Sequence, residues 1–164
     1  MDKLKKLIGN AYFRASHALT SLQSPLLLAI RLYWGWQFAQ DGWGKLTHLS
    51  RVAAFFASLN LPAPGVTALF CGLVESIGGI LFAAGIASRL VSFILFANMT
   101  VAYLSVPEDR VNFSHIMSNP GDFYGATPYT YWFAALLIMV LGPRRAGADT
   151  WLARLLSTKE DPGK

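Results

Sequence analysis

The chain has 164 residues and a net charge of +5, and 54% of its residues are hydrophobic while only 14% are charged. A soluble domain of this size has too little interior to bury so much apolar surface, whereas a lipid bilayer solvates it. The basic residues flank apolar runs and form no stripe interleaved with stacking aromatics. The composition therefore predicts an integral membrane protein whose partner is the lipid bilayer, and it excludes nucleic acid.

The N-terminal segment, residues 1–24, has apolar residues at helical spacing and a basic edge at Lys5 and Lys6. This pattern predicts an amphipathic helix that lies in the membrane interface. A solvated helix packed on a partner has the same pattern.

Four apolar segments follow, each bounded by proline, glycine or polar residues. About twenty helical residues cover the roughly 30 Å of hydrocarbon in a bilayer. The predicted spans are residues 25–44, 66–87, 90–106 and 128–141. The fold class is therefore all-α, an integral membrane four-helix bundle that occupies residues 25–156.

The connections differ in character. A short amphipathic helix is predicted from Leu49 to Asn60, and a polar loop over residues 107–127. A second interfacial helix is expected from Asp149 to Leu156, and residues 157–164 are expected to be disordered.

Orientation follows from the 14 Lys and Arg residues, of which ten flank the spans on one side, three lie on the other, and Arg31 lies within the first span. Lys and Arg accumulate on the cytoplasmic side of membrane proteins. Both termini are therefore predicted to be cytoplasmic, in a multi-pass protein of the cell inner membrane.

Five polar residues lie within or at the edge of spans. At 100° per residue, Arg31, Gln37, Asp41 and Lys45 form one stripe on the first span, and Glu75 lies on the second. Charges inside a membrane face a bundle interior or a polar cavity. We predict the pairs Arg31–Glu75 and Asp41–Lys45, either as packing contacts or as the lining of a site for a polar headgroup such as a quinone ring.

Other kinds of site have little support. The single cysteine, Cys71, lies in an apolar run, and His17, His48 and His115 belong to different segments. No metal site is predicted, and the sequence assigns no catalytic residue.

Several short motifs occur in a characteristic order. They are Arg31-Leu32-Tyr33, Gly42-Trp43-Gly44-Lys45, Pro62, Glu75-Ser76-Ile77-Gly78-Gly79, Gly85-Ile86-Ala87-Ser88-Arg89, and Gly142-Pro143-Arg144 with Asp149. In this order they resemble the DoxX family over roughly residues 25–155. One departure is Arg144, where many relatives have Gly.

The resemblance implies a four-helix bacterial inner-membrane protein whose family-like polar residues are Arg31, Lys45, Glu75 and Arg89. The family takes its name from a subunit of a thiosulfate:quinone oxidoreductase, and other members are linked to membrane redox complexes. Some close relatives resemble components found with copper-binding peptide biosynthesis.

Two functions follow from these observations. In the first, the chain is a small subunit of a quinone-linked redox system with a partner redox protein. Arg31 and Lys45 would donate to quinone oxygens, Glu75 or Asp41 would carry protons, and Tyr33, Trp34 and Trp36 would wall the ring. In the second, it is a non-catalytic membrane scaffold for a cytoplasmic enzyme or a metal-binding peptide pathway.

Overall fold

The computed structural model describes residues 2–142 and 148, and these residues form helices joined by turns, with no strand among them. The all-α prediction is therefore confirmed for this part of the chain. The expected helix at Asp149–Leu156, the expected tail at residues 157–164 and Arg144 in the closing turn lie outside the described residues.

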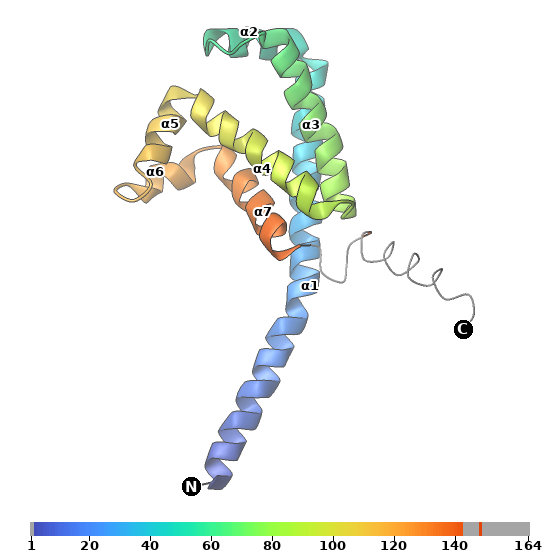
Figure 1. Ribbon diagram of the computed structural model, residues 1–164, viewed down its shortest axis with the longest axis vertical. Coiled ribbons are helices and arrows are strands. Elements are labelled where there is room, and N and C mark those ends of the chain that lie inside the picture. The colour runs from blue at the N-terminus through green and yellow to red at the C-terminus, as the bar shows by residue number, and fades with distance from the viewer. Residues whose placement is uncertain (1, 143–147, 149–164) are drawn as a thin grey trace, which may run out of the picture.

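Helix α1 runs without interruption from Asp2 to Thr47, and its N-terminal half projects beyond the other helices (Figure 1). The sequence predicted that a new helix starts at Pro25, but Pro25 lies inside α1. A proline removes one backbone hydrogen bond, and membrane helices tolerate this loss where neighbouring groups compensate. The amphipathic segment and the first predicted span thus form one helix.

Four of the later helices begin at a proline. Proline suits the first helical turn because its fixed φ is already helical and its missing N–H would have no partner there. These helices are α3 (Pro64–Ala84), α5 (Pro107–Ser114), α6 (Pro120–Gly125) and α7 (Pro128–Leu141). The fourth predicted span coincides with α7, whereas the predicted loop contains α5 and α6.

The remaining helices match the predicted segments closely. Helix α2 covers Leu49–Ser58, and α4 covers Ser88–Ser105. A short turn joins α3 to α4, with Gly85 at φ +73° and Ala87 at φ +46°, both in the left-handed region. Within the described residues, α3 and α4 are long and apolar enough to cross a membrane, and α7 is apolar but shorter.

Helices α1 and α3 pack antiparallel along a seam of glycines. Gly35 and Gly42 on α1 lie seven residues apart, as do Gly72 and Gly79 on α3. A methyl group added to Gly35 would come within 2.7 Å of the Gly79 carbonyl oxygen, and one added to Gly79 within 2.5 Å of the Ala39 nitrogen. The backbones are therefore in direct contact, as small residues allow in membrane helices.

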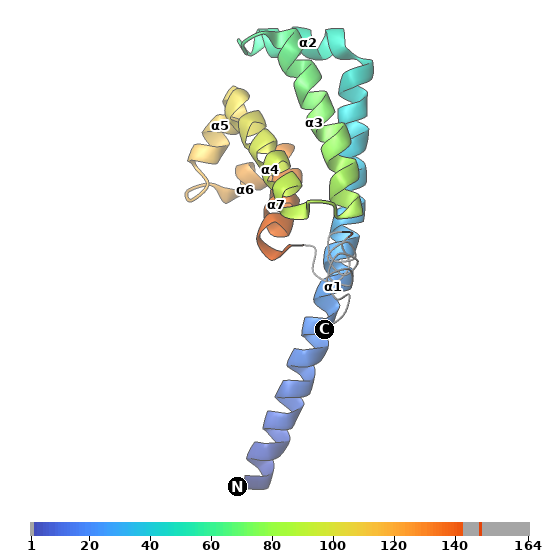
Figure 2. The same ribbon diagram turned by 45° about the vertical axis from the view of Figure 1, so that its right-hand side comes forward.

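Helices α4 and α7 form a second pair beside the first, as both views show (Figures 1 and 2). Trp132 on α7 donates from Nε1 to Thr100 Oγ1 on α4 at 3.0 Å, and Tyr103 donates to the Phe123 carbonyl on α6 at 3.1 Å. The two pairs share one core. Its buried members are Leu27, Phe38, Phe82, Val91, Leu95, Met99, Ala135 and Ile138.

Candidate functional site

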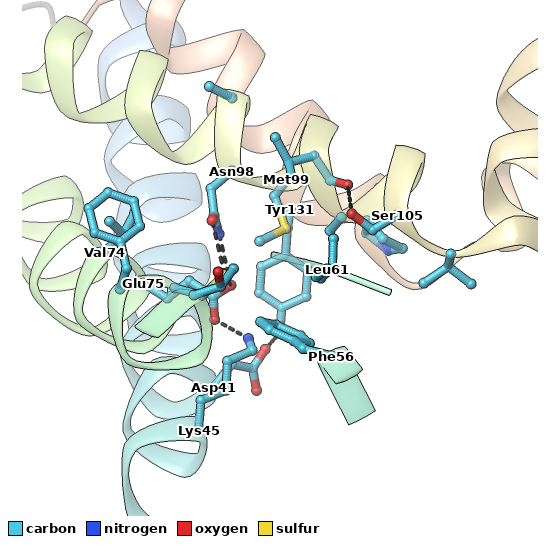
Figure 3. A pocket seen from close by; sticks show the side chains of 18 of the residues that line it. Asp41, Lys45, Phe56, Leu61, Val74, Glu75, Asn98, Met99, Ser105 and Tyr131 are labelled. Carbon is cyan, nitrogen blue, oxygen red and sulfur yellow. Dashed lines mark hydrogen bonds and ion pairs between the residues drawn. The ribbon is translucent and has the colours of Figure 1, made fainter. Parts of the chain in front are cut away.

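A cavity of about 710 Å³ lies between the two helix pairs, with α2 at one end. Each helix contributes residues at helical spacing: Phe38, Asp41 and Lys45 from α1, and Cys71, Val74 and Glu75 from α3, among others. On α4 the lining residues include Ile94, Ala97, Asn98, Val101 and Ala102, and on α7 they include Pro128 and Tyr131. Figure 3 shows Asp41, Lys45, Glu75, Asn98 and Tyr131 converging from these four helices.

The polar groups of the cavity are centred on Glu75, whose side chain is only 2% exposed. Lys45 Nζ forms an ion pair with Glu75 Oε2, and Asn98 Nδ2 donates to Glu75 Oε1 at 2.9 Å. Cys71 Sγ donates to Asn98 Oδ1 at 3.1 Å. A buried carboxylate with two donors is satisfied, so this cluster connects α1, α3 and α4 without leaving Glu75 uncompensated.

A second polar contact joins α7 to α1. The Tyr131 hydroxyl donates to Asp41 Oδ2, and Asp41 is itself exposed (Figure 3). The Tyr131 ring packs edge-on against Phe38 and Trp34, at centroid distances of 4.9 and 5.1 Å. The aromatic contacts fix the ring, and the hydroxyl brings Asp41 to the edge of the cavity.

Arg31 lies elsewhere. Its side chain is 1% exposed, and it donates from Nε to the Phe82 carbonyl at 3.2 Å and from Nη2 to the Ala83 carbonyl at 3.1 Å. These carbonyls belong to the last turn of α3, where backbone acceptors and the negative end of the helix dipole favour a cation. Gly85 leaves the space that the guanidinium occupies. Arg31 therefore caps α3 two helical turns from Glu75.

Both predicted charge pairs are wrong. Lys45 pairs with Glu75 rather than with Asp41, and Arg31 reaches the end of α3 rather than Glu75. The physical reason is the register of the glycine seam, which places Gly42 against Gly72 and Ser76. In this antiparallel register Arg31 lies opposite the end of α3, while Lys45 lies close to Glu75.

Three of the five predicted site residues line the cavity, namely Asp41, Lys45 and Glu75. Gln37 is half-buried and, like Arg31, does not line it. The aromatic wall also differs from the prediction. Tyr33, Trp34 and Trp36 are not among the lining residues, and Phe38, Phe55, Phe56, Phe70, Phe93 and Tyr131 take their place.

The sequence reasoning missed two residues of the site. Tyr131 lies in an uncharged apolar segment, and nothing in the local sequence indicates that its hydroxyl meets Asp41. Asn98 on α4 donates to the buried Glu75 on α3. An asparagine inside a span was the available signal.

The cavity extends toward α5, where Asp109 contributes to its lining. Partial burial raises the pKa of the Asp109 carboxyl above its usual value, and the negative charge of Glu108 raises it further. The Asp109 carboxyl at this end of the cavity therefore keeps its proton to a higher pH than an ordinary aspartate.

These features define a helical membrane protein with a polar cluster in a largely apolar cavity. The DoxX family model matches residues 26–108, which is about half of the chain and includes Lys45, Glu75 and Asn98. The chain belongs to the DoxX family, whose members are membrane proteins. No curated protein and no solved structure matches it.

Proposed function

We propose that this protein is a small quinone-binding subunit of a membrane redox system, and that a partner subunit exchanges electrons with the bound quinone. The observation that supports the proposal is the cavity itself. Its volume of about 710 Å³ falls in the range of small-molecule sites, and its few polar groups converge within aromatic and aliphatic walls. Such a site suits an apolar ring with polar oxygens.

Each polar residue has a role in this proposal. The Lys45 ammonium has three N–H donors, of which Glu75 engages one, so another is able to reach a ring oxygen. Asp41, one helical turn from Lys45 on α1, and Tyr131 on α7 offer an acceptor and a hydroxyl for the second ring oxygen. Glu75 holds Lys45 in place and exchanges protons through it.

The membrane arrangement is part of the proposal. The spans are α3, α4, α7 and the second half of α1, in the inner membrane, with both termini in the cytoplasm. Helix α7 has 14 residues, or about 21 Å at about 1.5 Å per residue. Local thinning of the bilayer accommodates such a short span.

The test uses the protein reconstituted in lipid nanodiscs and a photoreactive quinone that labels it. The double variant Lys45→Gln with Glu75→Gln removes both charges and keeps a hydrogen-bonded pair, so we expect normal folding and at least about tenfold weaker labelling. The matched control is Arg51→Gln with Glu108→Gln, which removes two exposed charges that do not line the cavity. Equal labelling of both variants and the wild type contradicts the proposal.

One observation favours the scaffold function as a second candidate. The projecting half of α1 exposes large apolar residues, with Tyr12, Phe13, Leu19 and Leu22 all more than half exposed. This surface suits the membrane interface or a partner protein. If deletion of residues 2–20 releases a cytoplasmic enzyme from the membrane while quinone labelling is unchanged, the scaffold function is supported.

A further inference from the structure

The cavity is closed at the back and open on one side. Its rear lining includes Phe38, with no exposed surface, and Met99, which is 7% exposed. In contrast, the lining residues Phe70 on α3 and Phe93 and Val101 on α4 are 65%, 55% and 58% exposed. A residue that both lines a cavity and is largely exposed lies on its rim. One opening therefore lies between α3 and α4.

The opening follows from how these helices are arranged. Helices α3 and α4 meet at the short turn after Gly85 and then diverge toward α2, as Figures 1 and 2 both show. Near the turn Leu95 fills the space beside Gly78, but farther along α4 the cavity is faced by the small residues Ala97 and Ala102. Small side chains leave the space between the diverging helices unfilled.

The surface around the opening is apolar. Ile77 and Ile80 on α3 and Leu90 on α4 are exposed beside it, and α3 and α4 are the two helices that meet the length and hydropathy requirements for crossing a membrane. A surface of this composition faces hydrocarbon in a membrane protein. The opening therefore leads sideways into lipid, whereas the polar cluster of Lys45, Glu75 and Asn98 lies at its inner end.

We infer that the ligand of this cavity has a polar ring and a long, flexible apolar tail, and that the tail leaves the protein through the gap between α3 and α4. The ring lies against Lys45, Glu75 and Asn98, and the first part of the tail passes between Ala97 and Val74. This inference rests on the proposed function and adds to it the class of ligand and its orientation. A quinone with an isoprenoid tail has this shape.

The test compares two competitors of the photoreactive quinone in nanodiscs: a quinone with an isoprenoid tail and the same ring with a methyl group instead. For the wild type we expect the tailed quinone to compete at least about tenfold better. Ala97→Trp fills the gap, so the tailed quinone should lose about tenfold while the methyl compound stays within about twofold. Val101→Trp on the exposed rim should act in the same direction and places little strain on the fold.

The matched control is Ala84→Trp, at the exposed end of α3 and outside the lining, which should change neither competitor. If both gap variants weaken both competitors equally, or if the tail gives no advantage in the wild type, the inference is wrong. If neither compound competes in the wild type, the proposed function itself fails.

A second copy of the chain is the other occupant to exclude. Phe93→Cys places a thiol on the rim, and oxidation should leave this variant monomeric. A disulfide-linked dimer in high yield would show that the gap is covered by another copy, and it would overturn the inference.

Discussion

The two sides of α3 are built in opposite ways. On the side of α1, Gly72 and Gly79 bring two backbones into contact, and no side chain separates them. On the side of α4, aromatic and aliphatic residues surround a cavity, and the helices diverge beyond the contact of Gly78 with Leu95. One face of α3 is in close contact with α1, and the other face lines the cavity.

This difference shows how a small bundle holds a cavity without losing its fold. Close contact between α1 and α3 fixes their register, and the register places Lys45 beside Glu75. On the open side, a few polar bonds replace continuous packing: Asn98 joins α4 to Glu75, and Tyr131 joins α7 to Asp41. The seam supplies stability, and the polar bonds set the width of the cavity.

The largest effect is expected from the charge cluster on the open side. Lys45→Met leaves the buried Glu75 carboxylate with Asn98 and the weaker Cys71 thiol as donors, and removing one partner of a buried pair costs about 3–5 kcal/mol. We expect about 3 kcal/mol, since Asn98 stays and Lys45 is partly exposed. The measurement is the free energy of unfolding in detergent micelles.

The double variant Lys45→Met with Glu75→Gln is the control for this prediction. It removes the uncompensated charge, so it should recover most of the stability that Lys45→Met loses. A double variant whose cost equals the sum of the two single costs would show that the pair does not determine the stability of this side.

The second effect concerns the seam. A methyl group at Gly42 overlaps Ser76 and comes within 2.7 Å of the Gly72 carbonyl, so α3 must move away. Overpacking costs about 1–3 kcal/mol, and backbone atoms yield less than side chains, so Gly42→Ala should cost about 2 kcal/mol. The same unfolding measurement checks it.

Gly44 is the matched control, two residues along the same helix, because a methyl group there meets nothing within 4 Å. Gly44→Ala should be neutral or stabilise by up to about 1 kcal/mol, since alanine favours helix over glycine. If Gly42→Ala and Gly44→Ala behave alike, the seam is looser than the structure shows.

The sequence alone was sufficient for the helices but insufficient for their contacts. Apolar runs and prolines located α3, α4 and α7 within a few residues, because span length and helix starts are local properties. The partner of Lys45 is not a local property, since it depends on which turn of α1 meets which turn of α3. The glycines of that seam, Gly72 and Gly79 on α3 with Gly35 and Gly42 on α1, set this register only once the two helices are packed together.

The site illustrates the same limit at longer range. Asp41 and Lys45 are four residues apart on one helix, a spacing that favours a local pair, yet each bonds a different helix. Tyr131 is 90 residues from Asp41, and the intervening chain contains five other helices. A contact of this kind follows from the assembled bundle and from no pattern within either segment.

The smallest effect is expected at the rim of the open side, where Asp109 titrates. Burial and the charge of Glu108 raise the pKa of Asp109 in the folded protein above its unfolded value of about 4. The folded state therefore binds the Asp109 proton more tightly than the unfolded state does. The stabilisation that this proton contributes is complete below about pH 4, and it is lost as the pH rises through the folded pKa. Asp109→Asn has no such proton, and the groups common to both proteins cancel in the difference. The stability of the wild type relative to Asp109→Asn should thus fall as the pH rises from about 4 through the folded pKa, by no more than about 0.5 kcal/mol at this partly exposed site. Thermal unfolding across this range measures the difference, with Glu108→Gln expected to reduce it. A difference that grows with pH would mean that Asp109 meets a cation at the rim, and the open side would then end in an ion pair rather than an isolated acid.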